Sequence, residues 1–314
     1  MHHTQTKDWL FTPDGIPRGY IQPQLLKELW FHTGTICNLS CPFCLEGSKP
    51  GDNRIEQLTF PEAKRFVDEA MDLGVEKFSF TGGEPFIIRD IAKILDYALT
   101  HRPCLVLTNG TKPLKVRMPE VLPLRGKPHR LSFRISLDYP DPEKHDESRG
   151  KGNFRMALET LGRLHNNGFS VSIARLQTPG EDGEEVNGAY RPFLVSVGIE
   201  ENLPFVVFPN LFPLDSENEV PFITQNCMTQ YKDEQSRSAF MCNYSKMVIK
   251  QGGKMRVYAC TLVDDDPFYD LGEILTEAMK VRIMLKHHRC YSCFAHGTSC
   301  SEPKLHTCEV QLRV

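Results

Sequence analysis

Residues 59–85, TFPEAKRFVDEAMDLGVEKFSFTGGEP, contain the pattern that decides the fold. Apolar residues recur at helical spacing from Pro61 to Leu73, with Thr59 placed to cap the start and Gly74 to end it. Val75–Phe80 then alternates as a strand. Because a helix that leads directly into a strand is typical of a parallel β–α unit, the chain on either side is expected to repeat it.

The same alternation extends in both directions from this stretch. Short apolar runs ended by turn residues predict further strands, and apolar spacing predicts further helices. The strands are Leu25–His32, Cys104–Thr108, Leu131–Leu137, Phe169–Leu176 and Phe205–Phe212, and the helices are Asp90–Thr100 and Asn153–Asn167. This order predicts an α/β protein whose parallel sheet is closed partly into a barrel. Ligands in such folds bind at the carboxyl ends of the strands.

The pattern changes after the last of these strands. Residues 177–190 are rich in Gly, Glu and Asp and predict a loop, and residues 213–238 are polar and irregular. Met247–Lys250 and Met255–Ala259, joined through two glycines, predict a hairpin. Gly272–Lys286 predicts a helix. We expect an N-terminal extension over residues 1–24, the barrel over 25–225, and a small cysteine-rich hairpin and helix extension over 226–314.

Composition and charge exclude several classes of protein. The 314 residues are 40% hydrophobic, and 37 basic against 40 acidic side chains give a net charge of −3. This balance argues against broad nucleic-acid binding, which needs a basic face. No apolar run approaches the ~20 residues of a membrane span, and the first residues do not resemble a signal peptide. We therefore expect a cytoplasmic protein without nucleic-acid or membrane partners, with the acidic run Asp264–Asp266 in a solvated loop.

Cysteine is the informative residue type. The chain has 11 cysteines, and in the reducing cytoplasm clustered cysteines more often bind metal than form disulfides. Cys37, Cys41 and Cys44 form a C-x3-C-x2-C run directly after a predicted strand. Three thiolates in one loop can hold three irons of a cubane cluster and leave the fourth iron open for chemistry. The alternative is a zinc site that a fourth residue, such as His32, would complete.

Polar side chains follow the ends of the next strands, on the rim where this cysteine run is expected. Gly82 and Gly83 let a ligand approach the backbone closely, and Glu84 offers an acceptor to an ammonium group. The other residues at these strand ends are Thr108, Ser136, Asp138 and Arg149.

With this ordered set of motifs, residues 25–212 resemble the radical S-adenosylmethionine (SAM) superfamily. The resemblance implies a partial (β/α)6 TIM-like barrel with a [4Fe-4S] cluster on Cys37, Cys41 and Cys44, whose open iron is chelated by the amino and carboxylate groups of SAM. It implies that Phe43 lies near the adenine. It also places Gly82, Gly83 and Glu84 at the amino group, and Thr108, Ser136 and Arg149 among the other SAM contacts, with the planar guanidinium suited to the carboxylate. Asp138 is either a further ligand or an ordering residue of its loop.

A second set of cysteines has the spacing C-x17-C-x29-C-x2-C and comprises Cys242, Cys260, Cys290 and Cys293. Together with the hairpin and the helix predicted after it, this spacing resembles the SPASM/twitch extension of many radical SAM enzymes. The resemblance implies an auxiliary [4Fe-4S] cluster with no open iron. One departure is the hairpin glycine, which lies two residues further from Cys260 than is usual in that extension.

Three other assignments of the tail cysteines stay open. Cys227, Cys300 and Cys308 are candidates for a further auxiliary cluster, although their spacing fits poorly. Cys290 and Cys293 with Cys308 are similar to the three-cysteine tail of the molybdenum-cofactor cyclase, whose cluster keeps an open iron. A structural zinc ribbon is the third possibility.

The resemblance also implies the chemistry. An external donor such as flavodoxin or ferredoxin supplies one electron, SAM is cleaved, and a 5′-deoxyadenosyl radical takes a hydrogen atom from the substrate. An auxiliary cluster suits the acceptance of the second electron, so we expect an oxidoreductase-like biosynthetic enzyme. The leading prediction for its substrate is a small molecule: a sugar, cyclitol, nucleoside or amino-acid derivative. No general base can be named.

Two other functions are kept. One is a radical SAM maturase that modifies a peptide or protein. It is weakened because only 36 residues precede Cys37, too few for the N-terminal peptide-recognition domain that many such enzymes carry. The other is a non-catalytic iron–sulfur or zinc-binding protein.

Overall fold

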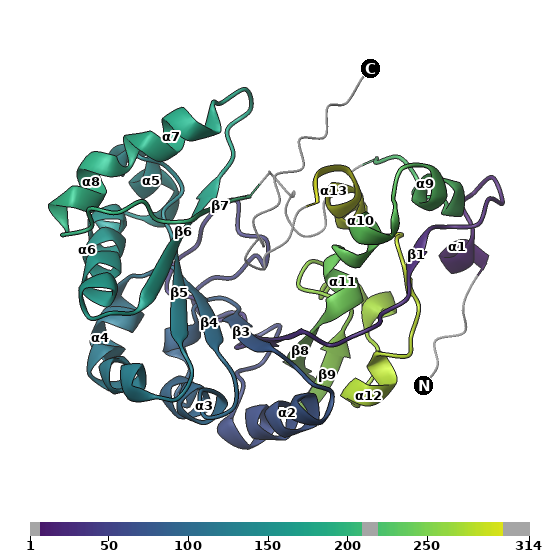
Figure 1. Ribbon diagram of the computed structural model, residues 1–314, viewed down its shortest axis with the longest axis horizontal. Coiled ribbons are helices and arrows are strands. Elements are labelled where there is room, and N and C mark those ends of the chain that lie inside the picture. Colours follow the sequence, from purple (N-terminus) through teal and green to yellow (C-terminus); the bar gives the residue numbers. More distant parts are fainter. Residues whose placement is uncertain (1–6, 209–218, 298–314) are drawn as a thin grey trace.

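A curved, mostly parallel sheet forms the centre of the molecule. The computed structural model describes residues 7–208 and 219–297. The strands of the sheet are β2 (Glu28–His32), β3 (Lys77–Thr81), β4 (Cys104–Thr108), β5 (Leu131–Ser136), β6 (Ser170–Leu176), β7 (Phe205–Phe208), β8 (Ser245–Gln251) and β9 (Lys254–Tyr258). They lie in the order β7-β6-β5-β4-β3-β2-β8-β9, and only the β8–β9 pair is antiparallel. Strands β2 to β7 form the partial barrel, which is open on one side (Figure 1).

Helices cover the outside of this arc (Figure 1). They are α2 (Phe60–Asp72), α3 (Ile91–Ala98), α4 (Lys112–Val121), α5 (Pro142–Arg149), α6 (Asn153–Asn166), α7 (Gly183–Ala189) and α8 (Arg191–Ser196), with the 3-10 turns η1 (Pro85–Ile87) and η2 (Leu122–Gly126). Helix α2 begins with a capping box between Thr59 and Glu62. Its apolar face, which includes Phe66 and Val67, is buried against the sheet. The capping residue and apolar spacing seen in the sequence therefore produce the helix that they predict.

The C-terminal residues form a smaller unit that continues the sheet through β8 and β9. Around that hairpin lie α9 (Gln225–Gln230), α10 (Glu234–Ser238), α11 (Met241–Tyr244), η3 (Pro267–Tyr269), α12 (Leu275–Ala278), β10 (Ile283–Met284) and α13 (His288–His296). The N-terminal elements α1 (Lys7–Leu10) and β1 (Tyr20–Ile21) belong to this unit in space. Strand β1 pairs with β10, and the ring of Trp9 packs against Tyr269 at 5.1 Å between centroids.

The predicted strands and the hairpin are confirmed, with small shifts at their ends. Strand β7 is described only to Phe208, because residues 209–218 lie outside the described part. The division at residues 24 and 225 stays a prediction. Among the described residues, no helix is both long enough and apolar enough to cross a membrane.

Three predictions of local structure were wrong. Residues 177–190 are not all loop, because Asp182 accepts two backbone N–H groups and starts α7. The irregular segment contains α9 and α10, which begin at the capping residues Thr224 and Asp233. The helix predicted over Gly272–Lys286 is limited to α12, because residues 283–284 pair with β1 instead. Pairing with a distant strand outweighed the local helical spacing.

Candidate active site

The loop that follows β2 carries the first three cysteines at the carboxyl ends of the parallel strands. Cys37 is buried, and Cys41 and Cys44 are partly buried. The Cys37 sulfur accepts the backbone N–H of Leu39 at 3.4 Å and the Asn109 amide at 3.8 Å. Burial raises the pKa of Cys37 to about 12 and raises the pKa of the other two thiols. These thiols therefore need a bound cation to become thiolates, and metal coordination deprotonates a thiol.

Gly82 and Gly83 hold this loop against the end of β3. The Gly83 N–H donates to the Gly34 carbonyl at 2.8 Å. A Cβ on Gly83 would lie 2.2 Å from the Ile36 carbonyl oxygen, and one on Gly82 would lie 2.7 Å from that of Gly34. The two glycines thus allow close packing against the backbone that leads into Cys37. Their contact with SAM stays a prediction.

Glu84 and Thr108 meet in the interior beneath the cysteine loop. The Thr108 hydroxyl donates to the Glu84 carboxylate at 2.8 Å, and the N–H groups of Asn109 and Phe86 donate to it at 2.9 and 3.1 Å. Burial raises the pKa of Glu84 to about 7 despite these donors. A carboxyl group with this pKa is an acceptor that an incoming ammonium group would stabilise in its charged form.

Asp138 and Arg149 form a buried ion pair on the far side of the same rim. The Arg149 guanidinium donates to both oxygens of Asp138, with Nη2 at 3.1 Å. The same guanidinium lies 5.6 Å from the centre of the Phe43 ring, and its positive charge favours the thiolate forms of Cys41 and Cys44. Asp138 therefore holds Arg149 in place, and its contact with SAM stays a prediction. Ser136 ends β5, partly buried, beside Ala174 of β6.

The second set of cysteines comes together from three elements of the C-terminal unit. Cys242 lies on α11, Cys260 lies two residues after the end of β9, and Cys290 and Cys293 lie on α13. A negative charge on Cys290 or Cys293 would raise the pKa of Cys242 and that of Cys260, which burial also raises. The Tyr269 hydroxyl lies 3.8 Å from the Cys290 sulfur. The structure thus brings four cysteines that are far apart in the sequence to one place.

One compact group of potential metal ligands lies beside the first cysteine loop. Among the described His, Cys, Asp and Glu residues, the one group of three or more with ligand atoms all within 4.8 Å of one another is His32, Glu46 and Asp264. Neither cysteine set as a whole meets this limit.

The remaining cysteines stand apart from these two sets where they are described. Cys104 is buried within β4 as an apolar side chain. The Cys227 sulfur lies 3.2 Å from the Thr224 hydroxyl at the start of α9. Cys300 and Cys308 lie outside the described residues.

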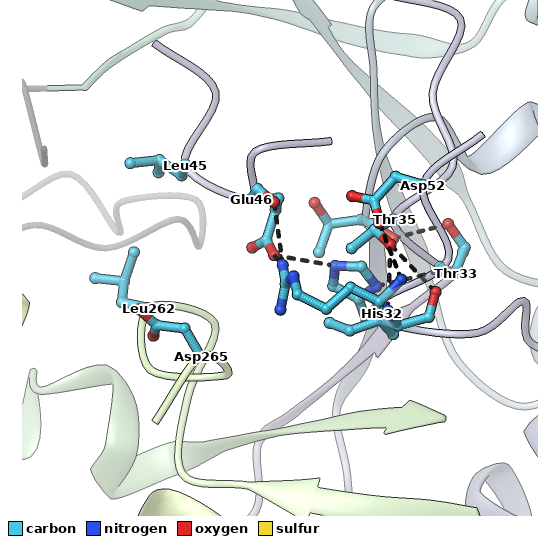
Figure 2. Close-up of polar contacts among 12 residues, drawn as sticks. His32, Thr33, Thr35, Leu45, Glu46, Asp52, Leu262 and Asp265 are labelled. Atoms are coloured by element: carbon cyan, nitrogen blue, oxygen red, sulfur yellow. Dashed lines mark hydrogen bonds and ion pairs between the residues drawn. The ribbon is translucent and has the colours of Figure 1, made fainter. Parts of the chain in front are cut away.

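A buried polar network beside the first cysteine loop was not predicted. His32 Nε2 lies 3.3 Å from a carboxylate oxygen of Glu46. Asp264 is only 1% exposed. The prediction that Asp264 lies in a solvated loop was therefore wrong. Figure 2 shows Glu46 pointing toward His32 at the carboxyl end of β2. Asp264 is buried because the loop after β9 packs against the cysteine loop, which a run of three acidic residues gives no reason to expect.

His32 is oriented for hydrogen bonding rather than for metal binding. Burial lowers its pKa to about 4, so the ring is neutral near pH 7. Its Nδ1 accepts the Gly34 N–H at 3.1 Å, which places the ring proton on Nε2, facing Glu46. A metal-bound histidine instead donates its second ring N–H to an acceptor. His32 is therefore not placed as the fourth ligand of the zinc alternative.

Sequence comparisons identify relatives of the barrel. Residues 31–191 match the sequence model of the Radical SAM superfamily. The mycofactocin maturase of Mycolicibacterium smegmatis is 35% identical over 135 residues, which are 43% of this chain and 33% of that protein. The antilisterial bacteriocin subtilosin biosynthesis protein of Bacillus subtilis is 33% identical over 140 residues, 44% of this chain and 30% of that protein. A GTP 3′,8-cyclase of Vibrio parahaemolyticus is 29% identical over 139 residues, 43% of this chain and 40% of that protein.

The fold has a counterpart among solved structures. Streptococcus suis SuiB bound to S-adenosylmethionine superposes with a TM-score of 0.60 at 15% identity, over 82% of this chain and 66% of that one. SuiB has also been solved with the precursor peptide SuiA. The chain spans about a third of the length of the first two sequence relatives.

Proposed function

The chain belongs to the radical SAM superfamily, and on that premise we propose that it is a peptide-modifying enzyme with two [4Fe-4S] clusters. Cys37, Cys41 and Cys44 hold the cluster that binds SAM, and Cys242, Cys260, Cys290 and Cys293 hold the auxiliary cluster. Together these cofactors supply a 5′-deoxyadenosyl radical, which takes a hydrogen atom from the substrate, and an acceptor for a second electron. The observation that carries the proposal is the convergence of the first cysteine loop, Glu84 and Arg149 on one rim of the barrel.

The side chains around the first cysteine loop divide the binding of SAM among them. Glu84, buried with three donors and a pKa of about 7, accepts from the amino group. Arg149, whose Nε and Nη2 are held by Asp138, binds the carboxylate through its remaining N–H groups. Phe43, whose ring centre lies 5.6 Å from that guanidinium, packs against the adenine. Thr108 positions Glu84, and Gly82 and Gly83 shape the floor. Ser136 contributes a hydroxyl at the end of β5.

The relatives support the proposed substrate class, since they include a maturase and a bacteriocin biosynthesis protein. They favour a peptide substrate over the small molecule predicted first. Other relatives, among them a GTP 3′,8-cyclase and an AdoMet-dependent heme synthase, support a small molecule. An external one-electron donor such as flavodoxin or ferredoxin is required in either case, and the reducing cytoplasm suits seven cysteine ligands.

SAM cleavage tests the assignment of the first cysteine set. The protein, reconstituted with iron and sulfide without oxygen and reduced with dithionite, is expected to release 5′-deoxyadenosine. Replacing all three of Cys37, Cys41 and Cys44 by alanine should abolish the release of 5′-deoxyadenosine. Cys104→Ala is the control, because this buried β4 residue lies outside both sets, and it should retain cleavage. A reconstituted wild-type protein that binds iron and sulfide but releases none contradicts the proposal.

Deuterium transfer tests the substrate class. Deuterated peptides encoded near the gene, and deuterated sugars and nucleosides, are incubated separately with the reduced enzyme and SAM. Deuterium in 5′-deoxyadenosine from a peptide, with a matching loss of deuterium from the peptide by mass spectrometry, supports the proposal. Transfer from a sugar or nucleoside alone restores the small-molecule prediction.

A further inference from the structure

A fully buried lysine lies beside the second cysteine set. Lys246 is on β8, opposite Leu29 of β2, and is 0% exposed. Its ammonium group donates to the carbonyl oxygens of Cys242 and Ser245, at 2.7 and 2.8 Å. Within the described part of the chain, no carboxylate lies within ion-pair distance of this nitrogen, and the charged groups that act on it are the thiolates of Cys242 and Cys260.

Two other cations held inside the described part of the fold have an anionic partner. Arg149 pairs with Asp138, and Arg175 pairs with Glu181. A buried charge without a counter-charge is strongly unfavourable, because neutral carbonyl groups replace only part of the hydration that is lost. A charged Lys246 therefore needs an anion in its surroundings.

Among the described residues, the anions that act on Lys246 are those of the cysteine site. A [4Fe-4S] cluster in its oxidised form carries two positive charges, so four thiolate ligands make the whole site a dianion, and reduction by one electron adds a third negative charge. A cation nearby stabilises the reduced form more than the oxidised form, and charge is one of the factors that set cluster potentials.

We propose that Lys246 is the counter-charge of the metal group on Cys242, Cys260, Cys290 and Cys293 and that it raises the reduction potential of that group. The identity of this metal group as a [4Fe-4S] cluster rests on the proposed function. The need for an anion beside Lys246 does not. The effect suits a site that accepts an electron, because a higher potential favours uptake. Lys246 is a positioning residue here, since it touches backbone carbonyls and acts through its charge.

A merely structural role for Lys246 predicts different behaviour. Lysine side chains near a helix end can cap the last carbonyls, and Cys242 lies on the short helix α11. Lys246→Gln keeps an N–H donor for such a carbonyl but removes the charge. Lys246→Met removes both. Lys250→Met is the matched control, because Lys250 lies on the same strand and pairs with Glu62 at 2.8 Å, away from the cysteines.

The test is a redox titration followed by electron paramagnetic resonance. It uses the full chain with Cys37, Cys41 and Cys44 replaced by alanine, so that only a cluster at the second site gives a signal. In Lys246→Gln and Lys246→Met we expect the ratio of reduced to oxidised cluster at a fixed potential to fall at least tenfold, which is 59 mV for one electron. Lys250→Met should leave it unchanged. The thermal midpoint of the metal-free protein should stay level or rise in Lys246→Met, because an uncompensated buried charge is removed.

Two results separate the possible failures. Unchanged potentials in both Lys246 variants overturn the proposal. If the thermal midpoint of the metal-free protein also falls in Lys246→Met alone, the role of Lys246 is to cap the carbonyl groups of α11. If the purified wild type carries zinc and no sulfide at the second site, the two-cluster function fails instead. The counter-charge is then tested by zinc loss to a chelator, which must be faster in Lys246→Gln than in Lys250→Met; equal rates overturn it.

Discussion

The Arg289 guanidinium donates to the Leu45 carbonyl at 3.2 Å and to the Leu262 carbonyl at 3.3 Å. Leu45 directly follows Cys44, and Arg289 directly precedes Cys290. One side chain, 1% exposed, therefore joins the loop of the first cysteine set to the helix of the second. Figure 2 shows Leu262 and Asp265, on the loop after β9, facing Leu45 and Glu46. The distance between the two cysteine sets is thus fixed by hydrogen bonds as well as by the shared sheet.

Replacing Arg289 with methionine should weaken this junction. The change leaves the two carbonyls without their Arg289 donor and removes a positive charge 3.9 Å from Asp265. We expect the free energy of unfolding of the metal-free protein to fall by about 3 kcal/mol, within the range for breaking a buried charged contact. Urea denaturation measures it. Arg282→Met, an exposed arginine stacked on Tyr20, should cost under about 1 kcal/mol; equal losses in the two variants would contradict the assignment.

Gly83→Ala should disturb the first cysteine loop. The added Cβ would lie 2.2 Å from the Ile36 carbonyl oxygen, and that atom belongs to backbone, which cannot turn aside as a side chain would. Overpacking of this kind typically costs about 1–3 kcal/mol. The iron content after reconstitution should fall, and so should the free energy of unfolding measured by urea denaturation. The control is Gly188→Ala on α7, where no atom lies within 4 Å of the added Cβ, and where alanine should raise stability by up to about 1 kcal/mol. A Gly83 variant that behaves like the Gly188 variant would rule out the close contact.

Local signals predicted most of the barrel. Thr59, the apolar face of α2 and Gly74 mark one helix completely, and Gly252-Gly253 mark the β8–β9 hairpin. The residues of the first site could also be named, because the ordered motifs that contain them resemble those of the radical SAM superfamily. Most of these motifs follow the carboxyl ends of strands, which parallel topology brings together.

Long-range packing hid the rest from the sequence. Strand β10 forms because β1 lies beside it, and the two are separated by most of the chain. Asp264 is buried by the approach of the cysteine loop, and Lys246 by the pairing of β8 with β2. A charged residue in a short polar run, or alternating in a strand, carries no local mark of such burial. The residues missed are therefore those placed by contacts between the barrel and the C-terminal unit.

Asp264→Asn should stabilise the metal-free protein, and more so at high pH. The Asp264 carboxyl group is buried beside Glu46, and burial and the negative charge of Glu46 raise its pKa. A raised pKa means that the stability contributed by the neutral acid is present at low pH and is lost as the pH rises through the folded value. The asparagine cannot ionise, so we expect a gain on the order of 1–3 kcal/mol at pH 8 and a smaller one at pH 5. Urea denaturation at the two values measures it, and a loss of stability at pH 8 would show that the charge has a partner.

Protonation of His145 should destabilise the fold in acid. Its Nδ1 accepts the backbone N–H of Asp138 at 3.2 Å, and burial lowers its pKa from 6.5 to about 4. Because the pKa is lowered, the stability that the neutral ring contributes is fully present above pH 6.5 and is lost as the pH falls toward 4. Protonation occurs on Nδ1, the nitrogen that accepts the Asp138 N–H, and breaks that hydrogen bond. The loss over that window is on the order of 3 kcal/mol.

In His145→Gln, which keeps an acceptor but does not titrate, the free energy of unfolding of the metal-free protein should vary less over this window. His165→Gln is the control with the opposite sign, since Glu201 raises the pKa of His165 and its contribution is lost as the pH rises. Denaturation from pH 7 to pH 4 that shows the same slope in wild type and His145→Gln would exclude a neutral, accepting His145.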